Sequence, residues 1–177
     1  DRASLLALVL PLLDGLERVH QAGFLHRDIK PDNIYVRDDA SPVLIDFGSA
    51  RNTDSGRDLT TIVSPGFAPF EQYHASGRQG PWTDLYALAA VMYWLVTGTK
   101  PLDSASRLKV DAMLPALQSA DQVQFGVDVL AAIDWALHPI RNIHHPCTQR
   151  LGNNGRVKYR NRQPFLHHGF GLRPFAC

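Results

Sequence analysis

The stretch His-Arg-Asp-Ile-Lys-Pro-Asp-Asn at residues 26–33, followed thirteen residues later by Asp46-Phe47-Gly48, decides how the rest of the chain is interpreted. Together the two stretches supply the carboxylates of Asp28 and Asp46 and the carboxamide of Asn33. These groups at these offsets are what a magnesium–nucleotide site needs, because the protein's part in phosphoryl transfer is to place metal ions and to orient a hydroxyl. The remaining sequence is therefore read as support for such a site.

Composition indicates one soluble globular domain followed by an unusual tail. The chain has 177 residues, of which 45% are hydrophobic and 20% charged, which suffices for a real core. Residues 1–137 hold 11 Lys and Arg against 17 Asp and Glu, a net charge of −6, whereas residues 138–177 hold 7 Lys and Arg and no acid. The domain boundary is therefore expected after Leu137.

Cysteine usage and hydropathy favour a cytoplasmic location. Both cysteines, Cys147 and Cys177, lie in the basic tail, so residues 1–137 contain no disulfide framework. The longest apolar run, Tyr86–Val96, has 11 residues, fewer than the roughly 18 that suggest a membrane span. A full-length parent could still be anchored in a membrane through a segment outside this sequence.

Apolar periodicity predicts two principal helices. Leucine and valine residues between Leu5 and Val19 recur at steps of three and four, which indicates an amphipathic helix that Pro11 bends and Gly23 follows in a left-handed conformation. Residues 85–97 are apolar nearly all round and precede Gly98, which predicts a core helix with Thr83 as its N-cap. Weaker patterns suggest helices over residues 110–119 and 127–137.

A short hairpin is predicted beside the 26–33 stretch. Residues 34–36 and 43–45 are β-prone and are separated by a turn-rich connector. Pairing them would bring Asn33 and Asp46 to the same end of the hairpin. Residues 49–67 are polar and aperiodic, so we expect a long functional loop there.

Four motifs in order resemble those of the bacterial, eukaryotic-like protein serine/threonine kinases. Residues 26–28 resemble the catalytic loop, residues 46–48 the magnesium-binding motif, Ala-Pro-Phe-Glu at 68–71 the end of the activation segment, and Asp84 the start of the large central helix. The resemblance covers residues 1–137 and implies a protein-kinase-like α+β fold, namely a mainly α-helical C-terminal lobe with a small catalytic-loop β-hairpin.

The resemblance also implies roles for the site residues and implies ATP and Mg²⁺ as cofactors. Asp28 would accept the proton of the substrate hydroxyl, and Lys30 would bind and steady the γ-phosphate. Asn33 and Asp46 would hold the magnesium ions and the nucleotide. His26 is expected to pack rather than to react. Lys30 and the following proline match kinases that act on proteins, so we expect a protein substrate and ATP as partners, and no nucleic acid.

Five residues resemble parts of an activation segment. Arg27 marks the class of kinases in which a phosphorylated loop is clamped by a basic pocket, and Thr60 and Thr61 are the natural acceptors, including for autophosphorylation. The alternative is that these two threonines are ordinary polar loop residues. Ser64 is expected to position Asp28 and Lys30, and Glu71 to form a buried ion pair.

Some parts of the family pattern do not occur in this sequence. No glycine-rich loop and no lysine in a Val-Ala-Ile-Lys-like strand precede the helix at residues 5–19 in this sequence. By the resemblance, we expect these residues to lack the N-terminal lobe and to be inactive, or nearly so, on their own. An alternative is a non-catalytic, pseudokinase-like binding module. Retention of Asp28, Lys30, Asn33 and Asp46 favours the catalytic interpretation.

Residues 134–139 still resemble the family, and the chain departs from the resemblance after Pro139. The arginine expected to pair with Glu71 has only Arg141 as a poorly placed counterpart, and residues 138–177 contain five of the eight histidines. The tail could be a basic arm for an acidic partner, a metal-binding tract, or a segment translated out of frame. His144, His145 and Cys147 match no standard zinc spacing, and the abrupt change of composition fits an out-of-frame segment best.

Overall fold

The structure of the chain is a computed structural model that describes residues 1–52, 63–74, 76–139, 150–151 and 157–158. The chain divides into two compact units, Asp1–Ile143 and His144–Cys177. In the second unit the described residues form one antiparallel pair, β5 (Arg150–Leu151) with β6 (Val157–Lys158). The boundary expected after Leu137 and the three explanations of the tail stay predictions.

The first unit is mainly helical with two small antiparallel sheets. Its long helices are α1 (Arg2–Gln21), α2 (Pro81–Thr97) and α5 (Val127–Ala136), and its short ones are α3 (Ala116–Ser119) and α4 (Gln122–Phe125). Its strands are β1 (Phe24–Leu25), β2 (Ile34–Val36), β3 (Pro42–Leu44) and β4 (Arg51–Asn52). Single 3₁₀ turns are η1 (Pro31–Asn33), η2 (Phe47–Ser49), η3 (Phe70–Tyr73) and η4 (Ser106–Leu108).

Helix α1 forms where the apolar periodicity predicts it. The Asp1 carboxylate accepts a hydrogen bond from the Ser4 N–H at 2.8 Å and so caps the first turn. Pro11 lies inside the helix and does not end it, as predicted. Gly23 follows the C-cap with φ 81°, the left-handed conformation that the sequence indicates. The buried stripe consists of Leu5, Val9, Leu12 and Leu16.

Helix α2 is the buried centre of the first unit and begins earlier than predicted. The prediction of Thr83 as N-cap is wrong, because the N-cap is Gly80 and Pro81 opens the helix. Pro81 suits this position since its missing N–H would have no helical partner there. Thr83 lies at the third helical position, where its Oγ1 accepts from the Gly80 N–H at 3.2 Å. Gly98 ends the helix with φ 69°, as predicted.

The region between α2 and α5 contains less helix than predicted. Residues 110–115 are not helical, and α3 covers only Ala116–Ser119. Asp111 explains part of this, because its carboxylate accepts from the Met113 N–H and from the Arg107 guanidinium and so stabilises a turn. The predicted helix over residues 127–137 is confirmed as α5, with Leu137 as its C-cap.

The predicted hairpin is confirmed with its second strand shifted by one residue. Strand β2 pairs antiparallel with β3 so that Ile34 faces Leu44. The Ile45 N–H donates to the Asn33 carbonyl at 2.9 Å and continues the pairing one step further. The segment predicted as a loop, 49–67, also contains β4, which pairs with β1, and its residues 53–62 lie outside the described residues.

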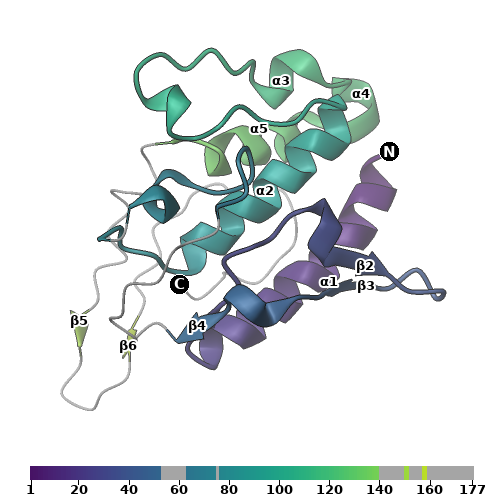
Figure 1. Cartoon of the computed structure of the whole chain (residues 1–177). Coiled ribbons are helices and arrows are strands. Elements are labelled where there is room, and N and C mark those ends of the chain that lie inside the picture. Colours follow the sequence, from purple (N-terminus) through teal and green to yellow (C-terminus); the bar gives the residue numbers. More distant parts are fainter. Residues whose placement is uncertain (53–62, 75, 140–149, 152–156, 159–177) are drawn as a thin grey trace. The chain divides into compact units, whose positions relative to one another are not determined.

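The core of the first unit lies around α2. Figure 1 shows α2 running through the middle, with α1 and the hairpin on one side and α3, α4 and α5 on the other. Side chains at this core, among them Leu16, Tyr86, Leu130 and Ile133, are at most 1% exposed. Each such burial contributes roughly 1.5–3 kcal/mol. The hairpin and the residues that flank it are therefore built on a rigid helical base.

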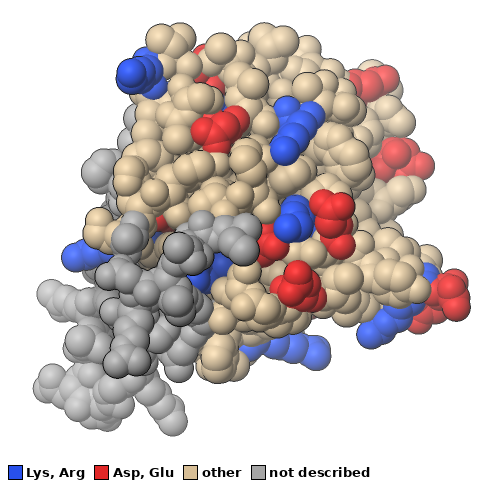
Figure 2. Space-filling model, viewed as in Figure 1, with Lys and Arg blue, Asp and Glu red and all other residues tan. Residues whose placement is uncertain are grey.

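The surface shown in Figure 2 carries both signs of charge. Lysine and arginine side chains are interspersed with aspartate and glutamate among uncharged residues on this face of the described chain. The acidic side chains visible on this face are thus scattered rather than gathered in one patch. Among the described helices, none combines the length and the apolar character needed to cross a membrane.

Candidate active site

The turn that presents Asp28 is held by Asp84, the first acidic residue of α2. Asp84 is fully buried, and its two carboxylate oxygens accept hydrogen bonds from the backbone N–H groups of His26 at 2.9 Å and Arg27 at 2.8 Å. His20 of α1 places its Nε2 2.8 Å from the same carboxylate. Arg27 has φ 71°, a conformation disfavoured for residues other than glycine. Asp84 therefore ties the turn before Asp28 to α2 directly and to α1 through His20.

His26 packs beneath this turn. It is fully buried, its Nδ1 accepts from the Asp28 N–H at 3.4 Å, and its Nε2 lies 3.1 Å from the Ile45 carbonyl. Since Nδ1 acts as the acceptor, Nε2 carries the proton and donates to Ile45. The Phe47 ring lies 4.6 Å from the imidazole ring, centroid to centroid. These contacts agree with the packing role predicted for His26.

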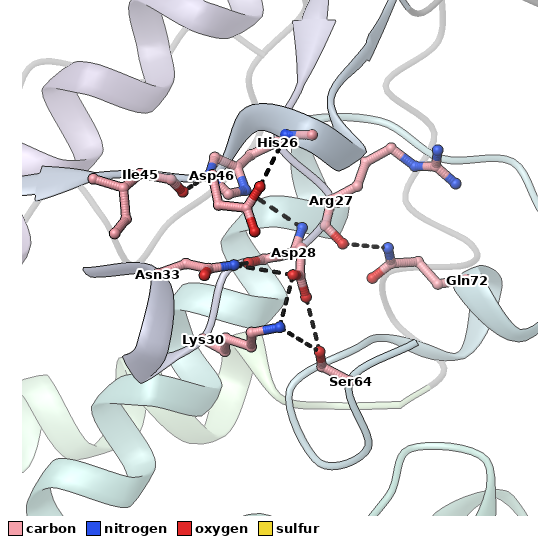
Figure 3. A network of polar contacts seen from close by, with 10 residues as sticks. His26, Arg27, Asp28, Lys30, Asn33, Ile45, Asp46, Ser64 and Gln72 are labelled. Atoms are coloured by element: carbon pink, nitrogen blue, oxygen red, sulfur yellow. Dashed lines mark hydrogen bonds and ion pairs between the residues drawn. The ribbon is translucent and has the colours of Figure 1, made fainter. Parts of the chain in front are cut away.

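The Asp28 carboxylate is the hub of a polar network drawn in Figure 3. Its Oδ1 accepts from Ser64 Oγ at 2.8 Å, and its Oδ2 accepts from Lys30 Nζ at 2.8 Å and from Asn33 Nδ2 at 2.9 Å. Lys30 Nζ also reaches Ser64 Oγ at 3.4 Å. A carboxylate offers about four acceptor directions, so these described donors leave about one for a substrate hydroxyl.

The charge state of Asp28 follows from this network. Burial alone would raise the pKa of the Asp28 carboxyl, but the hydrogen bonds from Lys30, Ser64 and Asn33 and the positive charge of Lys30 outweigh it and lower the pKa below its ordinary value. The group is therefore an ionised acceptor at neutral pH. The Asp28 carboxylate can therefore orient a hydroxyl group and accept its proton.

Asn33 and Asp46 flank the hairpin and contribute oxygen atoms beside Asp28. The Asn33 amide donates through Nδ2 to both the carbonyl and the carboxylate of Asp28, at 2.7 and 2.9 Å, which leaves its Oδ1 as an acceptor. Asp46 is exposed and left-handed, with φ 61°, and one of its carboxylate oxygens accepts from the Gly48 N–H. Figure 3 shows the Asp46 carboxylate directed toward Asn33 and Asp28. Carboxylate and carboxamide oxygens are ligands that suit Mg²⁺.

Only some of the residues that resemble an activation segment lie at this site in the described part of the chain. Ser64 contacts Asp28 and Lys30, and the positioning role expected for it stays a prediction. Arg27 Nε donates to Gln79 Oε1 at 2.6 Å. Thr60 and Thr61 lie outside the described residues, so the prediction that they are phosphate acceptors concerns a part of the chain that is not described.

Glu71 is a buried carboxyl away from Asp28. It accepts from Thr83 Oγ1 at 2.9 Å and is 5% exposed. Burial, only partly opposed by its hydrogen bonds, raises the pKa of Glu71 above the ordinary value. Arg141, the nearest counterpart of its expected partner, lies outside the described residues.

Sequence reasoning missed several groups that support the site. Gln72 donates from Nε2 to the Arg27 carbonyl at 2.7 Å, and Ser104 Oγ donates to the Ala68 carbonyl at 2.8 Å. The sequence places Asp84 at the start of a helix but gives no sign that its carboxylate also holds the turn at residues 26–27. A single glutamine or serine carries no periodic or motif signal, so these contacts could only be found in three dimensions.

Comparison with known proteins agrees with this geometry. The model of the protein kinase domain matches residues 2–145. The chain belongs to the protein kinase family. The kinase relatives include PknA of Nostoc sp., 43% identical over 103 residues, and PknL of Mycobacterium tuberculosis, 34% identical over 145 residues, and both are serine/threonine-protein kinases. They identify the family type as a bacterial serine/threonine kinase.

A solved kinase-fold structure supports the fold as well. The structure entitled PpkA-294 apo form superposes with a TM-score of 0.64 at 38% sequence identity, over 78% of this chain and 49% of that one. The predicted kinase-like fold, mainly helical with a small hairpin, is thereby confirmed. The match to PknA covers 53% of this chain and 18% of PknA, and the match to PknL covers 77% of this chain and 36% of PknL. This chain therefore spans only a part of each relative.

Proposed function

We propose that this kinase domain transfers the γ-phosphate of ATP to serine or threonine hydroxyls of a protein substrate. The observation that carries the proposal is the Asp28 carboxylate, which is held by Ser64, Lys30 and Asn33 within 2.9 Å and retains about one acceptor direction. Membership of the kinase family supports the reaction class.

Asp28 and Lys30 would act on the reacting groups. The ionised Asp28 carboxylate would accept a hydrogen bond from the substrate hydroxyl, fix its direction of attack and take up its proton. Lys30 Nζ, 2.8 Å from Asp28, would lie beside the transferring phosphate and balance its charge. A preorganised donor of this kind contributes about 10²- to 10³-fold to the rate.

Asn33 and Asp46 would hold Mg²⁺ through Asn33 Oδ1 and the Asp46 carboxylate, and these residues fit that ion because both supply hard oxygen donors. When bound, the metal neutralises charge on the ATP phosphates. The amide of Asn33 also donates to Asp28, so this residue would tie the metal-binding side of the site to the hydroxyl-binding side.

The substrate side of the site would be formed by Ser64, which contacts both Asp28 and Lys30. A protein substrate is favoured because Lys30 with the following proline matches the protein-directed kinases. Thr60 or Thr61 would be acceptors for autophosphorylation, and a phosphate there would pair with the Arg27 guanidinium.

The test is phosphate transfer by the 177-residue chain, alone and joined to the ATP-binding lobe of PknA, together with calorimetric binding of Mg–ATP. We expect the joined protein to label a generic protein substrate and Asp28→Asn to reduce the rate by at least 10²-fold. The matched control is Asp32→Asn, because Asp32 is an exposed acid in the same stretch. Binding of Mg–ATP without Asp28-dependent transfer would overturn the proposal. Failure to bind even when joined would favour a non-catalytic binding module.

A further inference from the structure

The backbone at Arg27 needs support from outside its own loop. Arg27 has φ 71° and immediately precedes Asp28, so a change of its backbone angles would redirect the Asp28 side chain. Residues other than glycine adopt this conformation only where the surrounding structure imposes it. The groups that hold Arg27 therefore decide where the Asp28 carboxylate points.

Gln72 is one of these groups and comes from a distant part of the chain. It lies in η3, is 2% exposed, and donates from Nε2 to the Arg27 carbonyl at 2.7 Å (Figure 3). The same segment contacts Arg27 twice more, because Gln79 Oε1 accepts from its guanidinium and Asp84 accepts from its backbone N–H. Segment 72–84 thus holds the carbonyl, the N–H and the side chain of one residue.

The segment that carries Gln72 is itself firmly attached. On one side Glu71 accepts from Thr83 Oγ1 of α2 at 2.9 Å. On the other, Ser104 Oγ donates to the Ala68 carbonyl at 2.8 Å, and the Tyr73 hydroxyl bonds to Asp103. These contacts fix the backbone on both sides of Gln72 to α2 and to the loop that follows it. A movement of residues 64–73 would consequently change the position of the Arg27 backbone.

We propose that Gln72 is a positioning residue that couples the end of the activation segment to the catalytic loop, acting on Asp28 through the Arg27 carbonyl. Its relevance to phosphoryl transfer rests on the proposed function, but the coupling itself is a property of the structure. Ser64, from the same segment, contacts Asp28 directly at 2.8 Å. The segment thus reaches Asp28 by two routes. Ser64 contacts the Asp28 side chain, and Gln72 contacts the carbonyl of the peptide group that precedes Asp28.

A purely structural role for Gln72 makes a different prediction. If the Gln72 amide only satisfied the buried Arg27 carbonyl, its loss would lower the stability of the fold. The surroundings of Asp28 in the molecules that remain folded would then be unchanged. A positioning role requires that loss of the Gln72 amide changes the conformation of the Arg27–Asp28 peptide. The Asp28 N–H, which donates to His26 Nδ1 at 3.4 Å, belongs to that peptide, so its environment separates the two roles.

The experiment compares Gln72→Met with Gln124→Met in the 177-residue chain, without nucleotide. Methionine keeps the length of the side chain and removes the donor, and Gln124 is an exposed glutamine of α4. The Asp28 amide is followed by hydrogen exchange and by its NMR chemical shift under conditions in which the chain stays folded, and urea midpoints report global stability. We expect Gln72→Met to speed exchange of the Asp28 amide about tenfold more than its loss of global stability accounts for and to shift the Asp28 amide signal, while Gln124→Met changes neither.

The proposal is overturned if Gln72→Met lowers only the urea midpoint. If that variant does not fold, the contact is tested in the wild-type chain. The side-chain amide protons of Gln72 should exchange with solvent at least tenfold more slowly than those of Gln124. Equal exchange rates would refute the contact. Because no ATP is used, a failure here is distinct from a failure of phosphate transfer. In the protein joined to an ATP-binding lobe, the coupling predicts a lower kcat with an unchanged KM for the protein substrate.

Discussion

At the scale of single residues, two buried carboxyl groups respond to their surroundings in opposite ways. The pKa of Asp28 is lowered because hydrogen bonds and the charge of Lys30 outweigh its burial, whereas the pKa of Glu71 is raised because burial outweighs its hydrogen bonds. Asp28 thus stabilises the fold above its unfolded-state pKa, and this contribution is lost as the pH falls through the lowered folded value. Glu71 has the reverse dependence.

The dependence of stability on Glu71 can be measured with Glu71→Gln, which keeps the shape and the acceptor for Thr83. Since the folded pKa is raised, the favourable contribution of Glu71 is complete below the unfolded value of roughly 4.3 and is lost as the pH rises through the folded value. We therefore expect Glu71→Gln to raise the urea midpoint at pH 8, and this gain to disappear near pH 4.

The matched control is Glu17→Gln, because Glu17 makes only an exposed hydrogen bond to Gln21 among the described contacts. It should leave the urea midpoint nearly unchanged at both pH values. A lower midpoint for Glu71→Gln at pH 8 would contradict the prediction. That outcome would indicate that a cation such as Arg141, which lies outside the described residues, pairs with the Glu71 carboxylate.

At the scale of elements, the sequence predicts helices whose apolar pattern extends over several turns and misses short elements that only distant pairing creates. The leucine stripe of α1 is periodic and the apolar run of α2 is long and continuous, so both helices and their glycine ends could be located. Strand β4 has two residues and exists because it pairs with β1, which no local pattern reveals. Residues 110–115 have a weak helical pattern, but the contacts of Asp111 with Arg107 and Met113 favour a turn.

Side chains of α5 should contribute strongly to the stability of the first unit. Leu130 of α5 is fully buried, so Leu130→Ala removes buried surface and leaves a cavity, and we expect it to lower the free energy of unfolding by about 2–5 kcal/mol. Leu114→Ala is the matched control, because Leu114 is 62% exposed, and it should cost less than about 0.5 kcal/mol. Urea denaturation at neutral pH checks both. Equal costs for the two variants would refute this assignment of the core.

At the scale of the whole molecule, the candidate site is assembled from segments far apart in sequence. Asn33 and Asp46 are joined by a hairpin, and this local geometry could be predicted. Ser64 and Gln72, in contrast, reach Asp28 and Arg27 across 36 and 45 residues. The family resemblance assigned Ser64 to the site, but Gln72 matched no motif. The sequence thus predicted the local geometry and the reaction class, and the packing of helices and loops decides the remaining contacts.

The division into two units predicts how the chain responds to shortening. Unit Asp1–Ile143 contains the described core and every described residue of the candidate site, so residues 1–143 alone should keep the fold. For a chain of this size 1 kcal/mol corresponds to about 2–4 °C in Tm, and we expect a change in Tm of less than about 2 °C.

Residues 1–126 are the comparison for this shortening, because they lack α5 and with it the buried Leu130, Ile133 and Leu137. We expect that chain not to fold cooperatively, since α2 would lose its packing against α5 and keep only that against α1 and α3 among these three neighbouring helices. Calorimetry of the three lengths distinguishes the outcomes. A Tm for residues 1–143 that is lower by 5 °C or more would mean that His144–Cys177 stabilises the kinase lobe. In that case the basic tail would have to be treated as part of the folded domain and not as an out-of-frame addition.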